Sequence, residues 1–400
     1  MEEYLNPDNK NSINTDKKIW SAYEKTRANY LEAEGIEYLS NCLKFANIYR
    51  NLEYTIVENG KKKKTELDGL LLLDNLLFIV EAKAGTLSLP ARRGAPSMVE
   101  DLKELVDNAY KQALRAKKYI SENEKSEFIL PNGEIFCLSK EDIEKIYLVN
   151  ITLENLDSFI VNLYKLRELG LVSESEFPWS VCITDLRIIS EIVATSCEFV
   201  HYLSRRLRIN ELEFVEAHDE IDWFSHYLHE GLYFENYSAS DNDKQIFTLG
   251  SYTSSFDDYY YHKLGYRTKA APKPRQPMPK VFQQFINELE QVHKRGYIKA
   301  ASALLDMDDE GRKDFSKAVL EIKRRTIHDR KAHNFTLEIS ETKLGITCIC
   351  LPQERFFEIP SILDEYCVGK RNELGLEKWI GFGINADSDK FVSYLLVIDK

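Results

Sequence analysis

Two carboxylates and one amine interrupt a pair of segments that are otherwise almost entirely apolar. Asp68 lies near the start of segment 67–73, Glu81 lies near the end of segment 76–82, and Lys83 follows that segment directly. Apolar runs of this length, bounded by turn residues, are typical of buried β-strands. Carboxylate oxygens are the ligands that hard divalent cations prefer, and a neighbouring ammonium group can stabilise developing negative charge. Together, these residue types indicate a divalent-metal site.

The turn between the two segments sets how the carboxylates face each other. Asp74-Asn75 is a dipeptide suited to the positive-φ positions of a two-residue hairpin turn, so Leu73 is predicted to lie opposite Leu76. The same register places Asp68 directly opposite Glu81. Opposed side chains of an antiparallel pair have Cβ atoms only about 5 Å apart. Two carboxylates this close, with little access to water, repel each other unless a cation lies between them.

The polar residues of the predicted hairpin share one face. Because side chains alternate along a strand, Glu66, Asp68, Glu81 and Lys83 all point to the same side. The rest of both faces is apolar, which places the hairpin in the middle of a sheet covered on both sides. The polar group is therefore either a metal site at the edge of the sheet or a salt-bridge cluster in which Lys83 neutralises Glu66 and Glu81.

A helix predicted over residues 16–43 must help to position this site. Its aromatic and aliphatic residues recur at three- and four-residue spacing, as on the buried face of an amphipathic helix. Glu34 lies on this stripe rather than on the polar face. Glu32 and Glu37 are expected on other faces, as ordinary surface residues.

A second helix is predicted over residues 97–120, after the hairpin. Alanines on its inner stripe allow close approach to the sheet, and Gln112 is the polar exception among them. The amide of Gln112 could hold a carboxylate ligand or a phosphate, or it could bond to a loop carbonyl. The loop before this helix carries Arg92 and Arg93, which either grip a phosphate backbone or form a solvated basic turn.

The string Glu66-Leu67-Asp68, a hydrophobic hairpin and then Val80-Glu81-Ala82-Lys83-Ala84-Gly85 resembles the PD-(D/E)xK nuclease superfamily, and within it the nuclease-related (NERD-like) branch. The motif covers about 20 residues, and the wider resemblance runs from the first helix to near Tyr119. Leu67 departs from the proline in the superfamily's name, at a position that is loose in the superfamily.

The resemblance implies a restriction-endonuclease-like fold, in which a mixed sheet is flanked by helices. It also implies a nuclease that uses Mg²⁺, with Mn²⁺ as a substitute, to hydrolyse DNA phosphodiester bonds. Bacterial defence and DNA maintenance are natural roles for such an enzyme. Two alternatives stay open: a catalytically silent nuclease-like module that binds nucleic acid or a partner protein, and a purely structural α/β protein.

The same resemblance implies roles for individual residues. Asp68 and Glu81 would bind the metal, helped by Glu34 and the carbonyl oxygen of Ala82, unless Glu34 simply reaches solvent. Lys83 would position or deprotonate a water molecule, or stabilise the transition-state charge. The superfamily often has a glutamine in the second helix. The candidate catalytic residues are therefore Asp68, Glu81, Lys83, Glu34 and Gln112.

The net charge of −12 argues against a non-specific nucleic-acid binder, because such proteins normally present a basic surface. Residues 61–120, however, contain 12 basic and 8 acidic residues, a local charge of +4. Several of the basic residues bracket the predicted site. Those expected to contact DNA are Arg92, Arg93, Lys111 and Arg115.

Other whole-chain features bound the partners and the location of the protein. The sequence has no Walker A loop, so a helicase or ATPase that acts with it would be a separate protein. Cutting both strands of a duplex would favour a homodimer. No apolar run approaches 18 residues, and no basic-then-apolar leader is present, which predicts neither a membrane span nor a secretory signal. Seven scattered cysteines without a C-x-x-C pair are typical of a reduced, cytoplasmic protein.

A chain of 400 residues exceeds a single typical core. The pattern of strands and helices predicts a nuclease-like α/β domain over residues 1–235. An irregular segment with a proline-rich linker follows over residues 236–280. Residues 281–400 are predicted to form a second, α+β domain.

Overall fold

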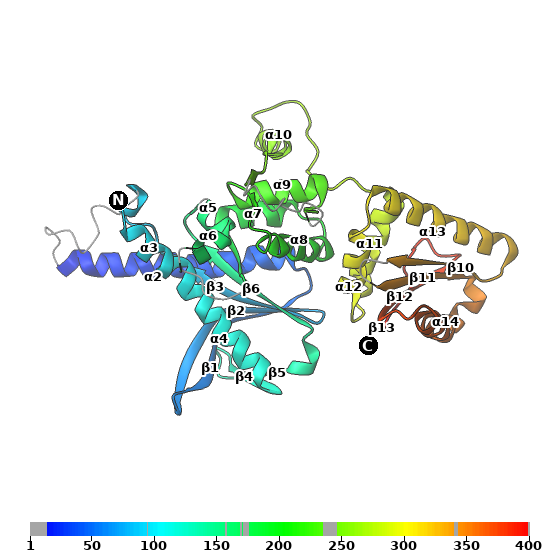
Figure 1. Ribbon diagram of the computed structural model, residues 1–400, viewed down its shortest axis with the longest axis horizontal. Helices are drawn as coiled ribbons and strands as arrows, with labels where there is room; N and C mark the ends of the chain where they lie inside the picture. The colour runs from blue at the N-terminus through cyan, green and yellow to red at the C-terminus, as the bar shows by residue number, and fades with distance from the viewer. Residues whose placement is uncertain are drawn as a thin grey trace. The chain divides into compact units, whose positions relative to one another are not determined.

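The computed structural model describes residues 14–93, 95–156, 158–168, 170, 176–234, 246–339 and 343–398. The chain forms two compact units, one up to Val193 with Tyr202–Arg275 and the other Ala194–His201 with Gln276 onward. Each unit contains its own mixed sheet and flanking helices (Figure 1), which confirms the predicted α/β class with a second α+β part. None of the described helices is both long enough and apolar enough to cross a membrane.

The main sheet of the first unit has seven strands in the order β5-β4-β1-β2-β3-β6-β7. Neighbours from β5 to β3 are antiparallel, whereas β3, β6 and β7 are parallel. The strands are β1 (Asn47–Glu58), β2 (Lys61–Leu73), β3 (Leu76–Lys83), β4 (Lys125–Ile129), β5 (Ile135–Ser139), β6 (Lys145–Thr152) and β7 (Trp179–Cys182). A small separate pair is formed by β8 (Val215–Glu216) and β9 (Phe247–Thr248).

Helices cover both faces of this sheet (Figure 1). A π-helical turn at Lys103–Asp107 joins α3 to α4. The helices are α2 (Asn14–Cys42), α3 (Ser97–Leu102), α4 (Asn108–Glu122), α5 (Ser158–Val161), α6 (Leu163–Glu168), α7 (Ile183–Ile192), α8 (Ser196–Ile209), α9 (Glu220–Glu230) and α10 (Ser254–Lys263). The sheet is close to α2, since a Cβ atom on Gly69 would lie only 2.7 Å from Cδ1 of Ile36. On α4, the buried alanines Ala109, Ala113 and Ala116 allow a similar approach.

The second unit contains a four-stranded sheet in the order β10-β11-β12-β13. β11 and β12 are parallel and are connected by α14, while both outer strands are antiparallel to their neighbours. These elements make the unit α+β, as predicted for this part of the chain. They are α11 (Lys280–Val292), α12 (Tyr297–Leu305), α13 (Asp309–Asp329), β10 (His333–Ile339), β11 (Leu344–Leu351), α14 (Ile359–Leu374), β12 (Lys378–Asn385) and β13 (Tyr394–Ile398).

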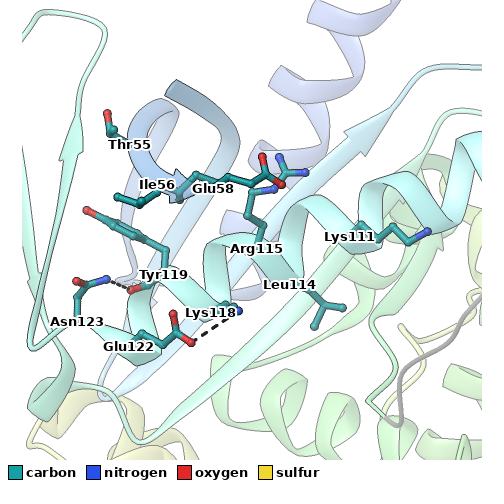
Figure 2. Close-up of a pocket in the computed structure, with 11 residues that line it drawn as sticks. Thr55, Ile56, Glu58, Lys111, Leu114, Arg115, Lys118, Tyr119, Glu122 and Asn123 are labelled. Atoms are coloured by element: carbon teal, nitrogen blue, oxygen red, sulfur yellow. Dashed lines mark hydrogen bonds and ion pairs between the residues drawn. The ribbon is translucent and has the colours of Figure 1, made fainter. Parts of the chain in front are cut away.

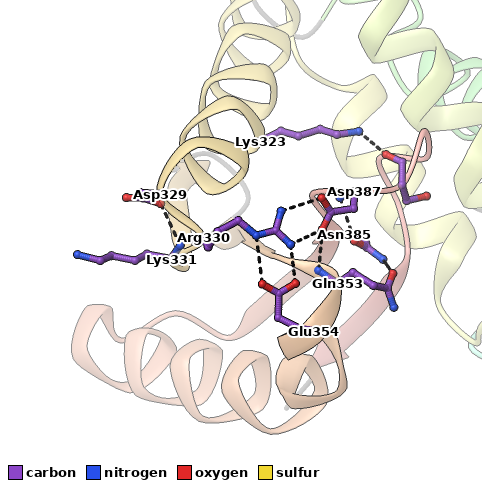
Figure 3. Close-up of polar contacts among 9 residues, drawn as sticks. Lys323, Asp329, Arg330, Lys331, Gln353, Glu354, Asn385 and Asp387 are labelled. Atoms are coloured by element: carbon purple, nitrogen blue, oxygen red, sulfur yellow. Dashed lines mark hydrogen bonds and ion pairs between the residues drawn. The ribbon is translucent and has the colours of Figure 1, made fainter.

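Arg330 ties the end of α13 to the loops that follow β11 and β12 (Figure 3). Its guanidinium group donates to both oxygens of Asp387, at 2.8 and 2.9 Å, and also bonds to Glu354. The backbone N–H of Gln353 donates to the same Asp387 carboxylate at 2.9 Å. The Arg330 bonds, and then this N–H, lower the pKa of Asp387 to about 2. The carboxyl ends of the two parallel strands are thus closed by a satisfied polar network.

The boundary between the units differs from the predicted one. The sequence predicts an irregular linker over residues 236–280, yet residues 246–275 belong to the first unit. There β9 pairs with β8, and the hydroxyl of Tyr260 on α10 donates to Glu191 at 3.2 Å. Because α10 is mostly polar, its sequence lacks the periodic apolar stripe that predicts a helix. Residues 236–245 lie outside the described residues.

Candidate active site

The hairpin of β2 and β3 has the predicted register. Leu73 pairs with Leu76, and the ladder continues until Gly69 lies opposite Val80. Asp74 takes a φ of 56°, so the turn uses a left-handed residue where the sequence predicts one. Both strands are apolar because they lie inside the sheet, between β1 and β6.

Asp68 and Glu81 follow at the end of this ladder, where backbone pairing between the strands stops. The backbone N–H of Ala82 donates to Oδ2 of Asp68 at 2.7 Å, so the carboxylate takes the place of a backbone acceptor. The negative charge of Asp68 is close enough to raise the pKa of Glu81. The structure therefore brings together the two acidic residues that the register predicts.

Glu81 is an acid in an unfavourable environment, with only 2% of its surface exposed. Burial and then the charge of Asp68 raise the pKa of Glu81 to about 8, although Lys83 opposes the shift. Nζ of Lys83 lies 3.3 Å from Oε2 of Glu81. Burial also raises the pKa of Asp68. Oε1 of Glu81 accepts no hydrogen bond from any described residue, and a buried oxygen of this kind could be satisfied by a cation.

A polar row continues from Glu81 across the two parallel strands. Glu81 is the register partner of Asn150 on β6, and Asn150 is the partner of Ser180 on β7. All three side chains are buried, with 2%, 1% and 1% of their surfaces exposed. Nδ2 of Asn150 lies 3.5 Å from the Ser180 hydroxyl, whereas its Oδ1 has no donor among the described residues. Asn150 therefore presents a second unsatisfied oxygen beside Glu81.

Sequence reasoning did not identify Asn150. The available signal was a polar residue near the end of the otherwise apolar strand 145–152. That signal could not place Asn150 beside Glu81, because it did not reveal that β6 pairs with β3. The two strands are separated by about 60 residues of chain.

The acidic residue of α2 that faces the site is Glu32, not the predicted Glu34. Burial and then the charge of Asp68 raise the pKa of Glu32, and Lys83 also acts on this carboxyl. Glu34 instead forms a hydrogen bond with the hydroxyl of Tyr38. Two residues of helix turn the side chain by about 200°, so these two glutamates point in different directions.

The error for Glu34 has a physical cause. The aromatic residues of α2 suggested the buried stripe, but Tyr30 is 53% exposed. The residues that pack on the sheet are the aliphatic ones, with Leu31, Ile36 and Leu39 at most 1% exposed. Placing the stripe on the wrong side of the helix therefore shifted the prediction from Glu32 to Glu34.

The second predicted helix brings Arg115 to the site. The guanidinium group of Arg115 lowers the pKa of Glu81 slightly against the dominant effect of burial. Its Nη1 also donates to the Thr65 hydroxyl at 3.4 Å. Gln112 lies almost one turn earlier on the same helix and is half-buried, and its Oε1 has no donor among the described residues. No described contact joins Gln112 to the two carboxylates.

The other predicted nucleic-acid contacts are less directly placed. Lys111 donates to the buried Asp107 at 2.6 Å, and Arg92 forms an ion pair of 2.7 Å with Glu154. Arg93 is exposed on the loop after β3. Of the four predicted basic residues, Arg115 lowers the pKa of Glu81.

The oxygen set fits a hard cation that keeps several of its own water ligands. Among the described residues, no three His, Cys, Asp or Glu side chains are close enough to hold a metal on their own. Mg²⁺ is commonly bound through one or two carboxylates, with water and substrate oxygens completing the octahedron. Asp68 and Glu81, with the carbonyl oxygen of Ala82, could supply that contribution. The unsatisfied Oε1 of Glu81 is the observation that supports the fit.

Comparisons with known proteins do not show which family the chain belongs to. No family model and no curated protein matches the sequence. One solved structure that does match is protein VC1899 from Vibrio cholerae, with 11% identity and a TM-score of 0.20 over 45% of this chain. The match covers 33% of that protein, so the chain spans about a third of its length. At this TM-score the likeness carries no argument about fold or function.

Proposed function

We propose that the first unit is a Mg²⁺-dependent nuclease of the PD-(D/E)xK type, which hydrolyses DNA phosphodiester bonds. The observation that carries the proposal is the proximity of two carboxylates, the half-buried Asp68 and the buried Glu81, at the end of a central hairpin. Lys83 lies 3.3 Å from Glu81, and one Glu81 oxygen has no donor. Such a group is costly in a fold that has no use for it, because burying unpaired carboxylates destabilises the native state.

Asp68 and Glu81 would hold the ion, with the Ala82 carbonyl, and Glu32 in place of Glu34 would hold one of the ion's water molecules. Bound Mg²⁺ supplies Lewis-acid polarisation of the phosphoryl oxygen and makes a metal-bound water more acidic. The Ala82 N–H holds Asp68 in a fixed orientation. Burial of Glu81 keeps bulk water away, which strengthens every charge interaction in the site.

Lys83 and Arg115 would act on the substrate. The ammonium group of Lys83 can stabilise the negative charge that develops on the phosphoryl group during attack. The guanidinium group of Arg115 can bind a phosphate oxygen beside the site. Lys83 lies 3.3 Å from Glu81, and Arg115 is near enough to lower the pKa of Glu81, so both groups are available to substrate bound at this carboxylate.

The proposal also specifies a setting. DNA is the substrate, a separate helicase or ATPase is the natural partner, and cutting both strands would be aided by a homodimer. All seven cysteines are free, in agreement with the proposed cytoplasmic location.

The test is cleavage of supercoiled and linear plasmid in Mg²⁺ by the parent protein and by Asp68→Asn, Glu81→Gln and Lys83→Met. We expect each substitution to lower the rate by about 100-fold or more. Asp74→Asn is the matched control, because it makes the same change at the turn of the same hairpin. Cleavage by Asp68→Asn at the rate of the parent would contradict the proposal.

Calorimetry with Mn²⁺ separates the nuclease from the catalytically silent module. The nuclease requires Mn²⁺ binding that is lost in Asp68→Asn and Glu81→Gln. A parent protein that retains DNA but shows neither cleavage nor this metal binding would be the silent module instead.

A further inference from the structure

β1 and β2 extend beyond the sheet as a two-stranded ribbon. β2 pairs with β3 only from Leu73 to Gly69, and β1 pairs with β4 at Glu53. Past these points, the ribbon strands Tyr54–Glu58 and Lys61–Thr65 pair with each other. Figure 1 shows this long hairpin projecting past the neighbouring strands.

The ribbon ends in a tight turn that keeps it regular to its tip. Glu58 pairs with Lys61, so Asn59 and Gly60 form a two-residue turn with φ values of 52° and 74°. Two positive φ values in succession define the hairpin turn whose twist matches that of the strands. The ribbon is therefore a defined β-structure rather than a loop.

Four consecutive lysines, Lys61–Lys64, occupy one strand of the ribbon, and all are exposed. Because side chains alternate along a strand, two of them point to each face. Lys63 forms an ion pair of 2.7 Å with Glu58, and Lys64 pairs with Glu53. Exposed pairs of this kind contribute little and are readily exchanged for other anions. Lys61 and Lys62 form no ion pair with any described residue.

The ribbon and α4 form the two walls of a groove of about 690 Å³ (Figure 2). The α4 wall carries Lys111, Arg115 and Lys118, which recur at four- and three-residue spacing and so lie along one side of the helix. The ribbon wall is formed by residues 55–58 of β1. Figure 2 shows the Arg115 side chain reaching toward Glu58 across the groove.

Two acidic residues also line the groove, and each is paired with a lysine. Glu58 accepts from Lys63 at 2.7 Å, and Glu122 lies 3.8 Å from Lys118. Both pairs are exposed, so a phosphate group could replace either carboxylate as the partner of its lysine.

Arg115 connects this groove to the candidate active site. It lines the groove, donates to Thr65 on β2 and acts on the pKa of Glu81. Arg115 is therefore shared by the groove and the candidate active site.

We infer that the ribbon and groove are a docking surface for double-stranded DNA. The major groove of B-DNA admits a two-stranded β-ribbon, and lysines at its faces can contact the flanking phosphates. The cationic side of α4 then follows the backbone of the strand that leads to Asp68 and Glu81. The choice of DNA rests on the proposed function, whereas the ribbon and its charges are independent of cleavage.

The test measures binding without cutting. A fluorescein-labelled duplex of about 20 base pairs is titrated with protein in EDTA at several salt concentrations, and anisotropy is recorded. The variant has alanine at all four ribbon positions, K61A, K62A, K63A and K64A. The matched control removes four exposed lysines of the second unit: K313A, K331A, K378A and K390A.

We expect the ribbon variant to bind the duplex at least about tenfold more weakly at low salt. Each lysine–phosphate contact favours binding by releasing counterions from the DNA, and the variant loses these contacts. The slope of log K against log salt should become shallower by about 2 to 4. The control variant should keep both values of the parent. Equal losses in both variants, or no loss in the ribbon variant, would overturn the inference.

The α4 wall has its own matched pair. Lys118 lines the groove, whereas Lys117 lies outside it and is paired with Glu176. Lys118→Gln should weaken duplex binding about three- to tenfold, and Lys117→Gln should leave it within about twofold of the parent. Circular dichroism confirms that each variant is folded. Equal effects of the two substitutions would contradict a role for the groove.

Two further outcomes assign the ligand. A single strand of the same length that binds more tightly than the duplex, with the ribbon lysines responsible, would overturn the choice of duplex. Duplex binding that depends on the ribbon, in a protein that does not cut in Mg²⁺, would support the inference while contradicting the proposed nuclease.

Discussion

The backbone N–H of Ala82 donates a 2.7 Å hydrogen bond to the carboxylate of Asp68. This bond lies one step past the last backbone pair of the hairpin, Gly69 with Val80. A side chain thus continues the ladder where the strands separate. The consequence is that Asp68 is held beside Glu81 by the fold itself, because hydrogen bonds to charged acceptors are shorter and stronger than neutral ones.

Asp68→Asn and Asp68→Ala should therefore differ in stability. Asparagine keeps an oxygen that accepts from Ala82 and removes the charge that repels Glu81, so the metal-free protein should be at least as stable as the parent at pH 8. Alanine leaves the Ala82 N–H without its acceptor and should lower the free energy of unfolding by about 1–2 kcal/mol. Urea unfolding in EDTA measures both. Equal stabilities for the two variants would show that the hydrogen bond contributes nothing.

The raised pKa of Glu81 predicts how stability varies with pH in the metal-free protein. The carboxyl titrates near 4.5 when exposed and at about 8 in the fold, so the native state binds more protons between these values. The free energy of unfolding should then fall as pH rises through this window.

Glu81→Gln should remove this contribution. Unfolding in urea and EDTA at pH 5 and pH 8.5 should show a smaller fall for the variant than for the parent, by on the order of 3 kcal/mol. Added Mn²⁺ should raise the melting temperature of the parent more at pH 8 than at pH 6, because protons compete for the same carboxylate. Identical pH dependence in parent and variant would mean that the fold does not raise the pKa of Glu81.

Two of the glutamates of α2, Glu32 and Glu34, provide a matched pair. Glu32 is under the influence of Asp68 and Lys83, whereas Glu34 bonds to Tyr38. Glu32→Gln should weaken the apparent affinity for Mn²⁺ several-fold, and Glu34→Gln should leave this affinity unchanged. Thermal unfolding across a range of Mn²⁺ concentrations measures the difference. A loss confined to Glu34→Gln would restore the original assignment.

How far the sequence predicts this site depends on how local the relationships are. The register of Asp68 and Glu81 follows from a turn and a two-residue period within about 20 residues of chain. Local patterns also predict the α+β character of the second unit. In both cases, neighbouring segments pack on each other, so local information suffices.

Relationships between distant segments were beyond such reasoning. β1, β4 and β5 join the sheet on the side away from β6, and neither their presence nor the sheet order was predicted. The ribbon requires the pairing of β1 with β2. Because β1 was not predicted, the four lysines were not recognised as part of a ribbon. The side of α2 that packs on the sheet was misjudged because exposed tyrosines suggested a buried stripe, which moved the prediction from Glu32 to Glu34.

Asn150 is the residue where this non-local information leads to a new prediction. Its Oδ1 has no donor among the described residues, and its strand places it next to Glu81. Asn150→Asp adds a carboxylate there, so it should tighten Mn²⁺ binding and destabilise the metal-free protein at pH 8. Asn150→Leu removes the oxygen at similar volume and should weaken Mn²⁺ binding about three- to tenfold.

Ser180→Ala is the control for both Asn150 variants. Ser180 is one strand further from Glu81 in the same buried row, so its loss should leave the Mn²⁺ affinity within about twofold of the parent. Isothermal titration calorimetry gives the affinities, and urea unfolding in EDTA gives the stabilities. If Asn150→Leu binds Mn²⁺ as tightly as the parent, the unsatisfied amide oxygen serves the packing of β6 rather than the ion. A tighter Asn150→Asp with a weaker Asn150→Leu would instead place Asn150 beside the bound metal.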